Sequence, residues 1–514
     1  MDKATEQQNN KRIAKNTLLL YFRMLLILGI SLYTSRIVLD TLGVVDYGIY
    51  NVVGGFVSTF AVLSGVMTTA TQRFISFEIG LGPNGNVQRI FSTTLVVHFI
   101  LAVVIFVLAE TIGLYFLNNQ MRIPEDRMDA AYYVFQLSLI TFLINVVSVP
   151  YTASIIAYEK MKAFAFVSIV EASLKLIIVF LVIKSSSDKL VLYALFLMLT
   201  AVSIRVMYSV YCRRNFEKCR FSLNFNTTET KKIFSFVGWN LIGSCSAVAK
   251  DQGVNVVLNL FFGTAVNAAR GVAYQVLNAL NGFATNFQLA MNPQIVKSYA
   301  SKDYEGMFRI VFKGSRLSFL MLLILTSPIL MEAETILNLW LVKVPEYTVL
   351  FLRLVLVTAM IDSLSGTLVA SMHASGNVKI YQIVVGGISL LTLPMVYLFL
   401  KSGFSPYSAL VICLIMAFVC HIARAILLHF TIQLPLVQYL KKVTARVVLV
   451  SIVSFIAPVV VKVSVPGTLI FSIVVAFISV LSAILASWFL GVDPDEKHFV
   501  IAKTKTILHR GHNG

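Results

Sequence analysis

A polar stripe runs along one predicted helix, in the stretch "RGVAYQVLNALNGFATNFQLAMNP" from Arg270 to Pro293. At about 100° per residue, seven of its side chains fall within an arc roughly 80° wide. They are Arg270, Tyr274, Asn278, Asn281, Thr285, Gln288 and Asn292. Amides and hydroxyls hydrogen-bond sugar hydroxyl groups, and Arg binds phosphate in a bidentate geometry. The stripe therefore predicts a surface for a polar or anionic ligand.

Two further predicted helices carry polar faces. An unpaired amide in hydrocarbon costs several kcal/mol, so such faces must meet protein or water. Hydrogen bonds between helices explain any single residue. A hydrated central cavity between two halves of the chain explains the set better. The residues are Asn51, Gly55, Ser58, Gly65, Thr69 and Gln72 in segment 48–72, and Asn240, Ser244, Asp251 and Asn255 in segment 233–259.

Basic side chains lie inside predicted membrane spans, among them Arg23, Arg36, Lys175, Arg205, Lys250, Arg353 and Arg424. Arg36 with Asp40, and Lys175 with Glu171, have the i,i+4 spacing of local ion pairs. Arg205, Arg353 and Arg424 lie near helix ends, from which they can reach the head groups.

We therefore expect a cationic substrate cavity, with an acidic group beside it for ion coupling, because protonating a carboxylate releases a neighbouring cation. Asp251 is the first candidate for this coupling group and Glu171 the second. The candidate substrate-binding residues are Arg23, Arg36, Asn51, Lys250, Arg270, Tyr274, Asn278, Asn281, Thr285 and Gln288.

No motif for catalysis, nucleotide binding or metal ligation occurs in the sequence, so neither an enzyme, a cofactor nor a metal site is expected. His421, Arg424 and His429 share one broad helix face, which we interpret as a helix end in the lipid head groups. None of the five cysteines falls on the outer side of the predicted topology, so no disulfide framework is expected.

The chain is predicted to be an all-α polytopic membrane protein, because 58% of its 514 residues are hydrophobic and only 13% are charged. Of its 42 Lys and Arg residues, 27 lie on the side of both termini, which the positive-inside rule places in the cytoplasm. The net charge of +18 then serves topology and anionic lipids, and no nucleic-acid partner is expected. The fourteen predicted spans are 16–38, 48–72, 91–115, 131–155, 163–183, 190–211, 233–259, 268–292, 310–331, 348–371, 380–400, 406–429, 443–462 and 467–490.

Three pairs of segments recur in the same order at a nearly constant offset, which indicates a duplicated six-span unit. "LGVVDYGIYNVVGG" is echoed by "FGTAVNAARGVAYQ", "TQRFISFEIG" by "NPQIVKSYAS", and "YEKMKAFAFVSIV" by "SGNVKIYQIVVGG". The pairs begin at Leu42 and Phe262, at Thr71 and Asn292, and at Tyr158 and Ser375. We expect two pseudo-symmetric six-helix bundles around a central cavity. The expected parts are an N-terminal segment 1–15, lobes 16–211 and 233–429 joined by a linker 212–232, an extra helix pair 443–490, and a basic tail 491–514.

The topology, the duplication and the early stretch "LDTLGVVDYGIYNVVGGF" followed by "TQRFISFEIG" resemble the bacterial polysaccharide flippases of the multidrug/oligosaccharidyl-lipid/polysaccharide exporter superfamily. The resemblance covers essentially the whole chain. It implies that the protein flips an undecaprenyl-diphosphate-linked oligosaccharide across the bacterial inner membrane by alternating access, coupled to a proton or sodium gradient. Other polysaccharide-assembly proteins are its expected partners, and a monomer is expected.

Two alternatives stay open at this point. A cation-coupled multidrug exporter of the same superfamily usually has twelve helices and an acidic cavity, which this sequence does not favour. A membrane enzyme of polysaccharide assembly would need a substantial outer loop, and the predicted outer loops are short.

Overall fold

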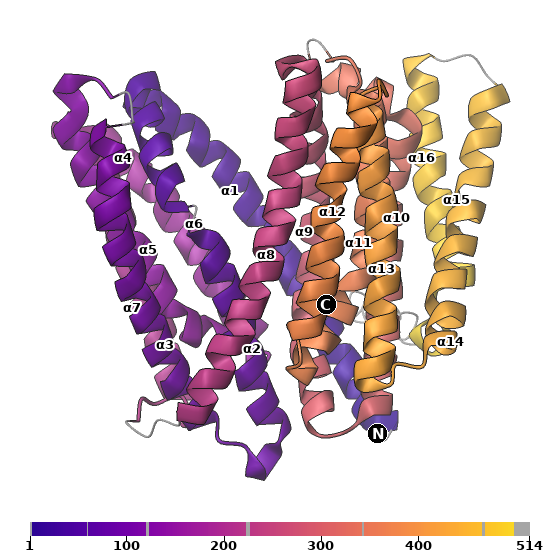
Figure 1. Ribbon diagram of the computed structural model, residues 1–514, viewed down its shortest axis with the longest axis horizontal. Helices are drawn as coiled ribbons and strands as arrows, with labels where there is room; N and C mark the ends of the chain where they lie inside the picture. The colour runs from indigo at the N-terminus through magenta and orange to yellow at the C-terminus, as the bar shows by residue number, and fades with distance from the viewer. Residues whose placement is uncertain are drawn as a thin grey trace, which may run out of the picture. The chain divides into compact units, whose positions relative to one another are not determined.

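The computed structural model describes residues 3–58, 60–119, 123–222, 227–341, 344–464 and 468–497 (Figure 1). Inside the first helix, α1 (Lys3–Ser58), several side chains are not described, among them those of Arg36 and Asn51. Every regular element within the described ranges is a helix, which confirms the expected all-α fold.

The first of two compact units comprises Met1–Cys245 and Asn292–Tyr304. In this unit α5 packs against α2, α3 and α7, while α6 packs against α1 and α7. The interior side chains along α5, such as Val134, Phe135 and Leu139, are fully buried. Its further elements are α2 (Ala61–Gly80), η1 (Gly82–Asn84), α3 (Val87–Leu108), η2 (Ala109–Gly113), α4 (Leu114–Asn119), η3 (Glu125–Arg127), α5 (Met128–Ala157), α6 (Met161–Ile183) and α7 (Lys189–Asn215).

The second unit comprises Ser246–Met291 and Glu305–Gly514. In this unit α13 packs against α11 and α12 around buried side chains such as Leu352, Leu356 and Leu410. Its elements are α10 (Tyr304–Trp340), α11 (Thr348–Ser375), α12 (Lys379–Lys401), α13 (Tyr407–Ile432), α14 (Leu436–Tyr439), η4 (Leu440–Thr444), α15 (Ala445–Ser464), α16 (Leu469–Ala486) and η5 (Ser487–Gly491).

Two long helices belong to both units. The division falls after Cys245 in α8 (Thr227–Phe262) and after Met291 in α9 (Thr264–Ala300). The sequence predicted a connection over 293–309, but α9 continues through Pro293 to Ala300. The expected lobes 16–211 and 233–429 stay predictions.

Eleven helices within the described ranges are long and apolar enough to cross a membrane. The three predicted spans absent from that set are 48–72, 233–259 and 268–292. These are the segments with polar faces, and their polar residues lower the mean hydropathy. Segment 48–72 is also divided, because α1 ends at Ser58 and α2 begins at Ala61. The protein is thus a multi-pass membrane protein in which three helices are too polar to face lipid all round.

The backbone repeats itself at the spacing that the sequence indicated. Gly43 (φ 77°) breaks α1, and Gly263 (φ 75°), in the echoed stretch, separates α8 from α9. Both lie in the left-handed region that favours glycine. Helices α6 and α12 each have 23 residues, and their first residues, Met161 and Lys379, are separated by nearly the same interval as the two glycines. The duplication is therefore a feature of the fold.

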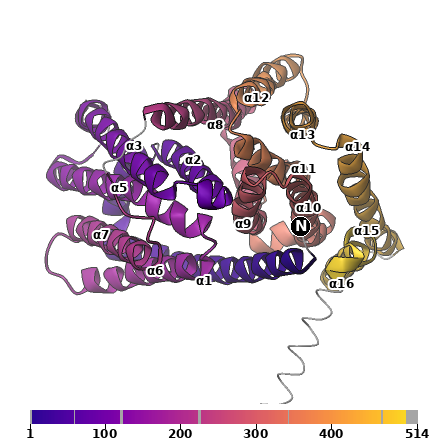
Figure 2. The same ribbon diagram turned by 90° about the horizontal axis from the view of Figure 1, so that it is seen from below.

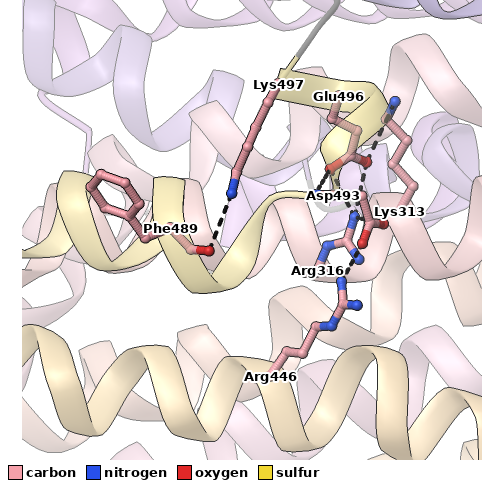
Figure 3. A network of polar contacts seen from close by, with 7 residues as sticks. All are labelled: Lys313, Arg316, Arg446, Phe489, Asp493, Glu496 and Lys497. Atoms are coloured by element: carbon pink, nitrogen blue, oxygen red, sulfur yellow. Dashed lines mark hydrogen bonds and ion pairs between the residues drawn. The ribbon is translucent and has the colours of Figure 1, made fainter.

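The helices beyond the duplication, α15 and α16, lie side by side (Figures 1 and 2). Ion pairs at both ends fasten them to α10. At one end Lys462 lies 2.8 Å from the carboxylate of Glu332, at a kink in α10. At the other end Arg316 of α10, only 2% exposed, donates to Asp493 (2.6 Å) and Glu496 (2.8 Å) after η5 (Figure 3).

The same network includes Arg446 of α15, which also donates to Asp493, and Lys313, which lies 3.5 Å from Glu496 (Figure 3). The side chain of Arg316 is buried, although its charge would favour the membrane surface. The carboxylates that allow this burial are far from Arg316 in the sequence, so only the tertiary structure reveals it.

Candidate functional site

The second unit contains a cavity of about 190 Å³ between α8, α9, α11 and α13. Five of the residues predicted from sequence line it: Lys250, Asp251, Arg270, Tyr274 and Asn281. The other lining residues are Ala247, Val254, Leu277, Val355, Thr358, Ala359, Asp362, Leu410 and Cys413. Part of the polar stripe of α9 therefore forms one wall of this cavity.

Arg270 is held firmly in place at this wall. Its Nη2 donates to the Asp251 carboxylate (2.5 Å) and to the Asp251 backbone carbonyl (3.1 Å). Its guanidinium also stacks over the ring of Tyr274, 4.1 Å from the centroid. The Arg270 side chain is 7% exposed. An Arg so enclosed by a carboxylate and a ring serves first as structure, and a ligand would have to compete with Asp251 for it.

Lys250 and Asp362 are the freer charges of the cavity. Within the described part of the chain, Lys250 has no carboxylate within 4.0 Å. Asp362 lies 3.9 Å from Arg424, and its side chain is 51% exposed. The cavity thus offers an ammonium and a carboxylate to a ligand, together with the amide of Asn281 and the hydroxyl of Thr358.

A buried polar network fixes Arg424 behind Asp362. Its Nε donates to the Tyr381 hydroxyl (3.2 Å) and its Nη1 to the Ser365 hydroxyl (3.1 Å). Ser365 also bonds His421 Nδ1 at 2.9 Å. Our interpretation of His421 as a head-group residue is wrong: it is 5% exposed, because Ser365 satisfies its ring nitrogen inside the unit.

The rest of the α9 stripe has other surroundings. Gln288 donates to the backbone carbonyl of Ser363 at 3.1 Å and approaches the backbone of Gly366 so closely that a Cβ there would clash. The Thr285 hydroxyl bonds to Asn281 O within its own helix, and Asn278 is exposed. Gln288 and Thr285 therefore have the interhelical and local hydrogen bonds that membrane bundles use widely.

Arg23 and Glu171, two candidates in the first unit, are not among the residues that line this cavity. Arg23 stacks over Phe164, 4.5 Å from its centroid, and its Nε is buried without a described partner. Glu171 pairs with Lys175 at 2.7 Å, as the i,i+4 spacing predicted. The side chains of Arg36 and Asn51 lie outside the described residues.

Two functional candidates were missed by sequence reasoning, Asp362 and Cys413. Asp362 is the single acid in the predicted span 348–371, a signal that could have been noticed, since intramembrane acids are rare. Cys413 carries no such signal. No cluster of three or more metal-ligating side chains occurs in the described ranges.

The fold is similar to that of solved transporter structures. The "Crystal structure of MATE in complex with MaD3S" aligns with a TM-score of 0.72 and 13% identity over 84% of this chain and 100% of the other. The "Outward-facing conformation of a multidrug resistance MATE family transporter of the MOP superfamily" gives a TM-score of 0.70 and 13% identity, over 82% and 96%.

A third similar structure is "Reverse polarity of binding pocket suggests different function of a MOP superfamily transporter from Pyrococcus furiosus Vc1 (DSM3638)". It gives a TM-score of 0.65 and 13% identity, over 80% of this chain and 94% of the other. No family model and no curated protein matches the sequence. At this identity the likeness establishes the fold of these transporters.

Proposed function

We propose that this protein is a transporter that flips a lipid-linked oligosaccharide across the bacterial cytoplasmic membrane by alternating access, with both termini in the cytoplasm. The observation that carries the proposal is Lys250, an ammonium that lines a cavity inside a membrane-embedded unit with no described carboxylate in contact. An ammonium with no direct ion pair is available to bind an anion, and the diphosphate of a polyprenyl carrier supplies one.

The other lining groups suit the sugar part of such a substrate. Asn281 offers an amide to sugar hydroxyls, and Tyr274 presents an aromatic side chain beside it. A lipid-linked glycan also needs only its head group to enter the cavity, since the polyprenyl tail can stay in the bilayer. The resemblance of "LGVVDYGIY" to the polysaccharide flippases points in the same direction.

Ion coupling would act through Asp251 in this proposal. Protonation of Asp251 releases Arg270 from its 2.5 Å hydrogen bond and adds a second cation to the cavity. Glu171 is the weaker candidate, because its partner Lys175 lies four residues away on the same exposed helix face.

Substitution of Lys250 tests the proposal. We expect Lys250→Ala to slow flipping of a fluorescent polyprenyl-diphosphate oligosaccharide in proteoliposomes by about tenfold to a hundredfold, the effect of one lost charge-assisted hydrogen bond. Lys250→Arg should retain most of the rate. The matched control is Gln275→Ala, a polar residue of α9 that is exposed, does not line the cavity and is not a binding candidate. Full flipping by Lys250→Ala would refute the cationic site.

A second function is favoured by the two carboxylates of the same cavity, Asp251 and Asp362. They would attract an organic cation, as in a multidrug exporter. In that case Asp362→Asn abolishes uptake of a cationic dye by the proteoliposomes, Lys250→Ala leaves it intact, and the lipid-linked glycan is not moved at all.

A further inference from the structure

A buried carboxylate outside the cavity draws together three distant elements of the first unit. Glu159, in the turn between α5 and α6, has a side chain only 3% exposed. It accepts hydrogen bonds from Lys297 Nζ (2.6 Å), Gln294 Nε2 (3.3 Å) and Arg12 Nη1 (3.3 Å). Burial disfavours the charged form, but these three donors together outweigh it and hold the pKa of Glu159 below its usual value. We call Arg12, Glu159, Gln294 and Lys297 the α9 latch.

The backbone of Glu159 is strained. Its φ of 58° is left-handed, which a residue with a Cβ adopts only under constraint. The second copy of the repeat uses glycine at the equivalent turn, where Gly376 ends α11 with φ 77°. The backbone conformation alone would therefore favour glycine at position 159. The contacts of the Glu159 carboxylate offset this cost.

The Glu159 carboxylate binds the last part of α9. Lys297 and Gln294 follow Pro293, and the division between the two units falls just before, after Met291. Proline removes one helix hydrogen bond and its ring crowds the carbonyl four residues earlier, so a bend forms there most readily. The part of α9 before Pro293 carries Arg270, Tyr274 and Asn281 of the cavity.

The end of α2 packs closely against the last part of α9. A Cβ on Gly80 would lie 2.7 Å from the Cβ of Ala300 and 2.7 Å from the carbonyl oxygen of Lys297. Glycine here lets the two helix ends touch, and these ends belong to the echoed stretches "TQRFISFEIG" and "NPQIVKSYAS". The latched segment thus rests on close packing as well as on charge.

We propose that the α9 latch is a conformational switch: it closes on the end of α9 in one state of the protein and opens in another, with Pro293 as the hinge. Because α9 also walls the cavity, the state of the latch selects the state of the cavity. This inference does not depend on what the cavity carries.

Thiol labelling of the full-length protein tests the switch without any substrate. Cys413 lines the cavity and reports on it, whereas Ser298→Cys reports on the latch. Cys245, the exposed native thiol, is replaced by Ser, and the three remaining cysteines are buried.

Reversing one charge of the pair, by Glu159→Lys or by Lys297→Glu, sets like charges in contact. This should make the latched state the minor one. We expect maleimide labelling of Ser298→Cys to become about tenfold faster or more, and the labelling rate of Cys413 to change by a similar factor. The triple variant Glu159→Lys, Lys297→Glu, Arg12→Ala rebuilds the pair without leaving Arg12 against a second cation. It should restore both rates, which also shows that the single variants fail locally and not by misfolding.

The matched control is Glu217→Lys, the same change at an exposed position of the first unit. It should leave both rates unchanged. A faster rate at Ser298→Cys with no change at Cys413 would overturn the proposal, because the latch would then not act on the cavity. Unchanged rates at both thiols in the single reversals would overturn it as well.

Discussion

At the scale of single residues, the stretch "LGVVDYGIY" that resembles the flippases has a structural role. Asp46 within it receives two hydrogen bonds from Arg127, from Nε at 2.8 Å and Nη2 at 2.6 Å. Arg127 Nη1 reaches Asp188, the N-cap of α7, at 2.6 Å. Tyr50 meets the ring of Tyr193 edge to face. The described contacts of the motif therefore stabilise the first unit.

The ion pairs of Arg127 with Asp46 and Asp188 make the stability of the fold depend on pH. The hydrogen bond from Arg127 lowers the pKa of Asp188. The carboxylate therefore adds stability that is fully present above the ordinary Asp pKa of about 3.9 and lost as the pH falls through its lower folded value. We expect the unfolding temperature in detergent to drop on acidification below about pH 4, and Arg127→Ala to remove that part of the drop while lowering the plateau above it. An identical acid profile in Arg127→Ala would contradict this assignment.

At the scale of elements, two glycines set the turns that begin the repeated helix pairs. A Cβ at Gly43 or Gly263 would meet no atom within 4 Å, so any cost of substitution comes from the backbone alone. Gly271, inside α9, also has open space around it but has a helical φ. Alanine substitutions at these three positions therefore measure the cost of positive φ without any steric clash.

We expect Gly43→Ala and Gly263→Ala each to lower the free energy of unfolding by about 1–2 kcal/mol, because alanine resists positive φ. Gly271→Ala should be neutral or slightly stabilising, since alanine is the better helix former. Urea or thermal unfolding in detergent measures all three. Equal losses at the three positions would show that space, and not φ, limits them.

The elements also show what the sequence could predict. Apolar length located the helices, and the echo between the two halves located the repeat, because both are signals carried along the chain itself. The extension of α9 to Ala300 depends on tertiary packing, such as the close approach of Gly80 to Ala300.

For the cavity, the spacing of polar residues pointed to Asp251, Arg270, Tyr274 and Asn281, and the rarity of charges inside membrane spans pointed to Lys250. Spacing could not show that Gln288 bonds α11 and not a ligand. Its partner, the backbone carbonyl of Ser363, belongs to a distant helix that only the folded chain brings close.

At the scale of the whole molecule, the chain is a duplicated unit with a helix pair attached. The attachment rests on charges that are costly unless paired: Arg316 is 2% exposed and Glu332 7%. Removing one partner of a buried ion pair costs about 3–5 kcal/mol, whereas replacing the whole pair by apolar groups costs little. The network around Arg316 is therefore a test of how α15 and α16 are held.

We expect Asp493→Asn combined with Glu496→Gln to lower thermal stability strongly, because Arg316 is left buried without a carboxylate. Adding Arg316→Met should recover most of the loss, because the buried cation is then gone and the remaining partners, Arg446 and Lys313, reach solvent. Thermal unfolding in detergent compares the double and triple variants. No recovery in the triple variant would mean that the carboxylates hold the segment by other contacts.

The left-handed backbone at position 159 has an evolutionary consequence. The two copies of the duplicated turn face the same folding problem, yet one uses Gly376 and the other Glu159. Glu159→Gly would relieve backbone strain of about 1–3 kcal/mol, but it would leave Lys297 and Gln294 without their carboxylate, and breaking such a buried pair costs about 3–5 kcal/mol. A deep mutational scan scored by abundance should therefore deplete Glu159→Gly while it tolerates changes at the exposed Glu217. The divergence between the two copies at this turn then follows from the partners that Glu159 meets.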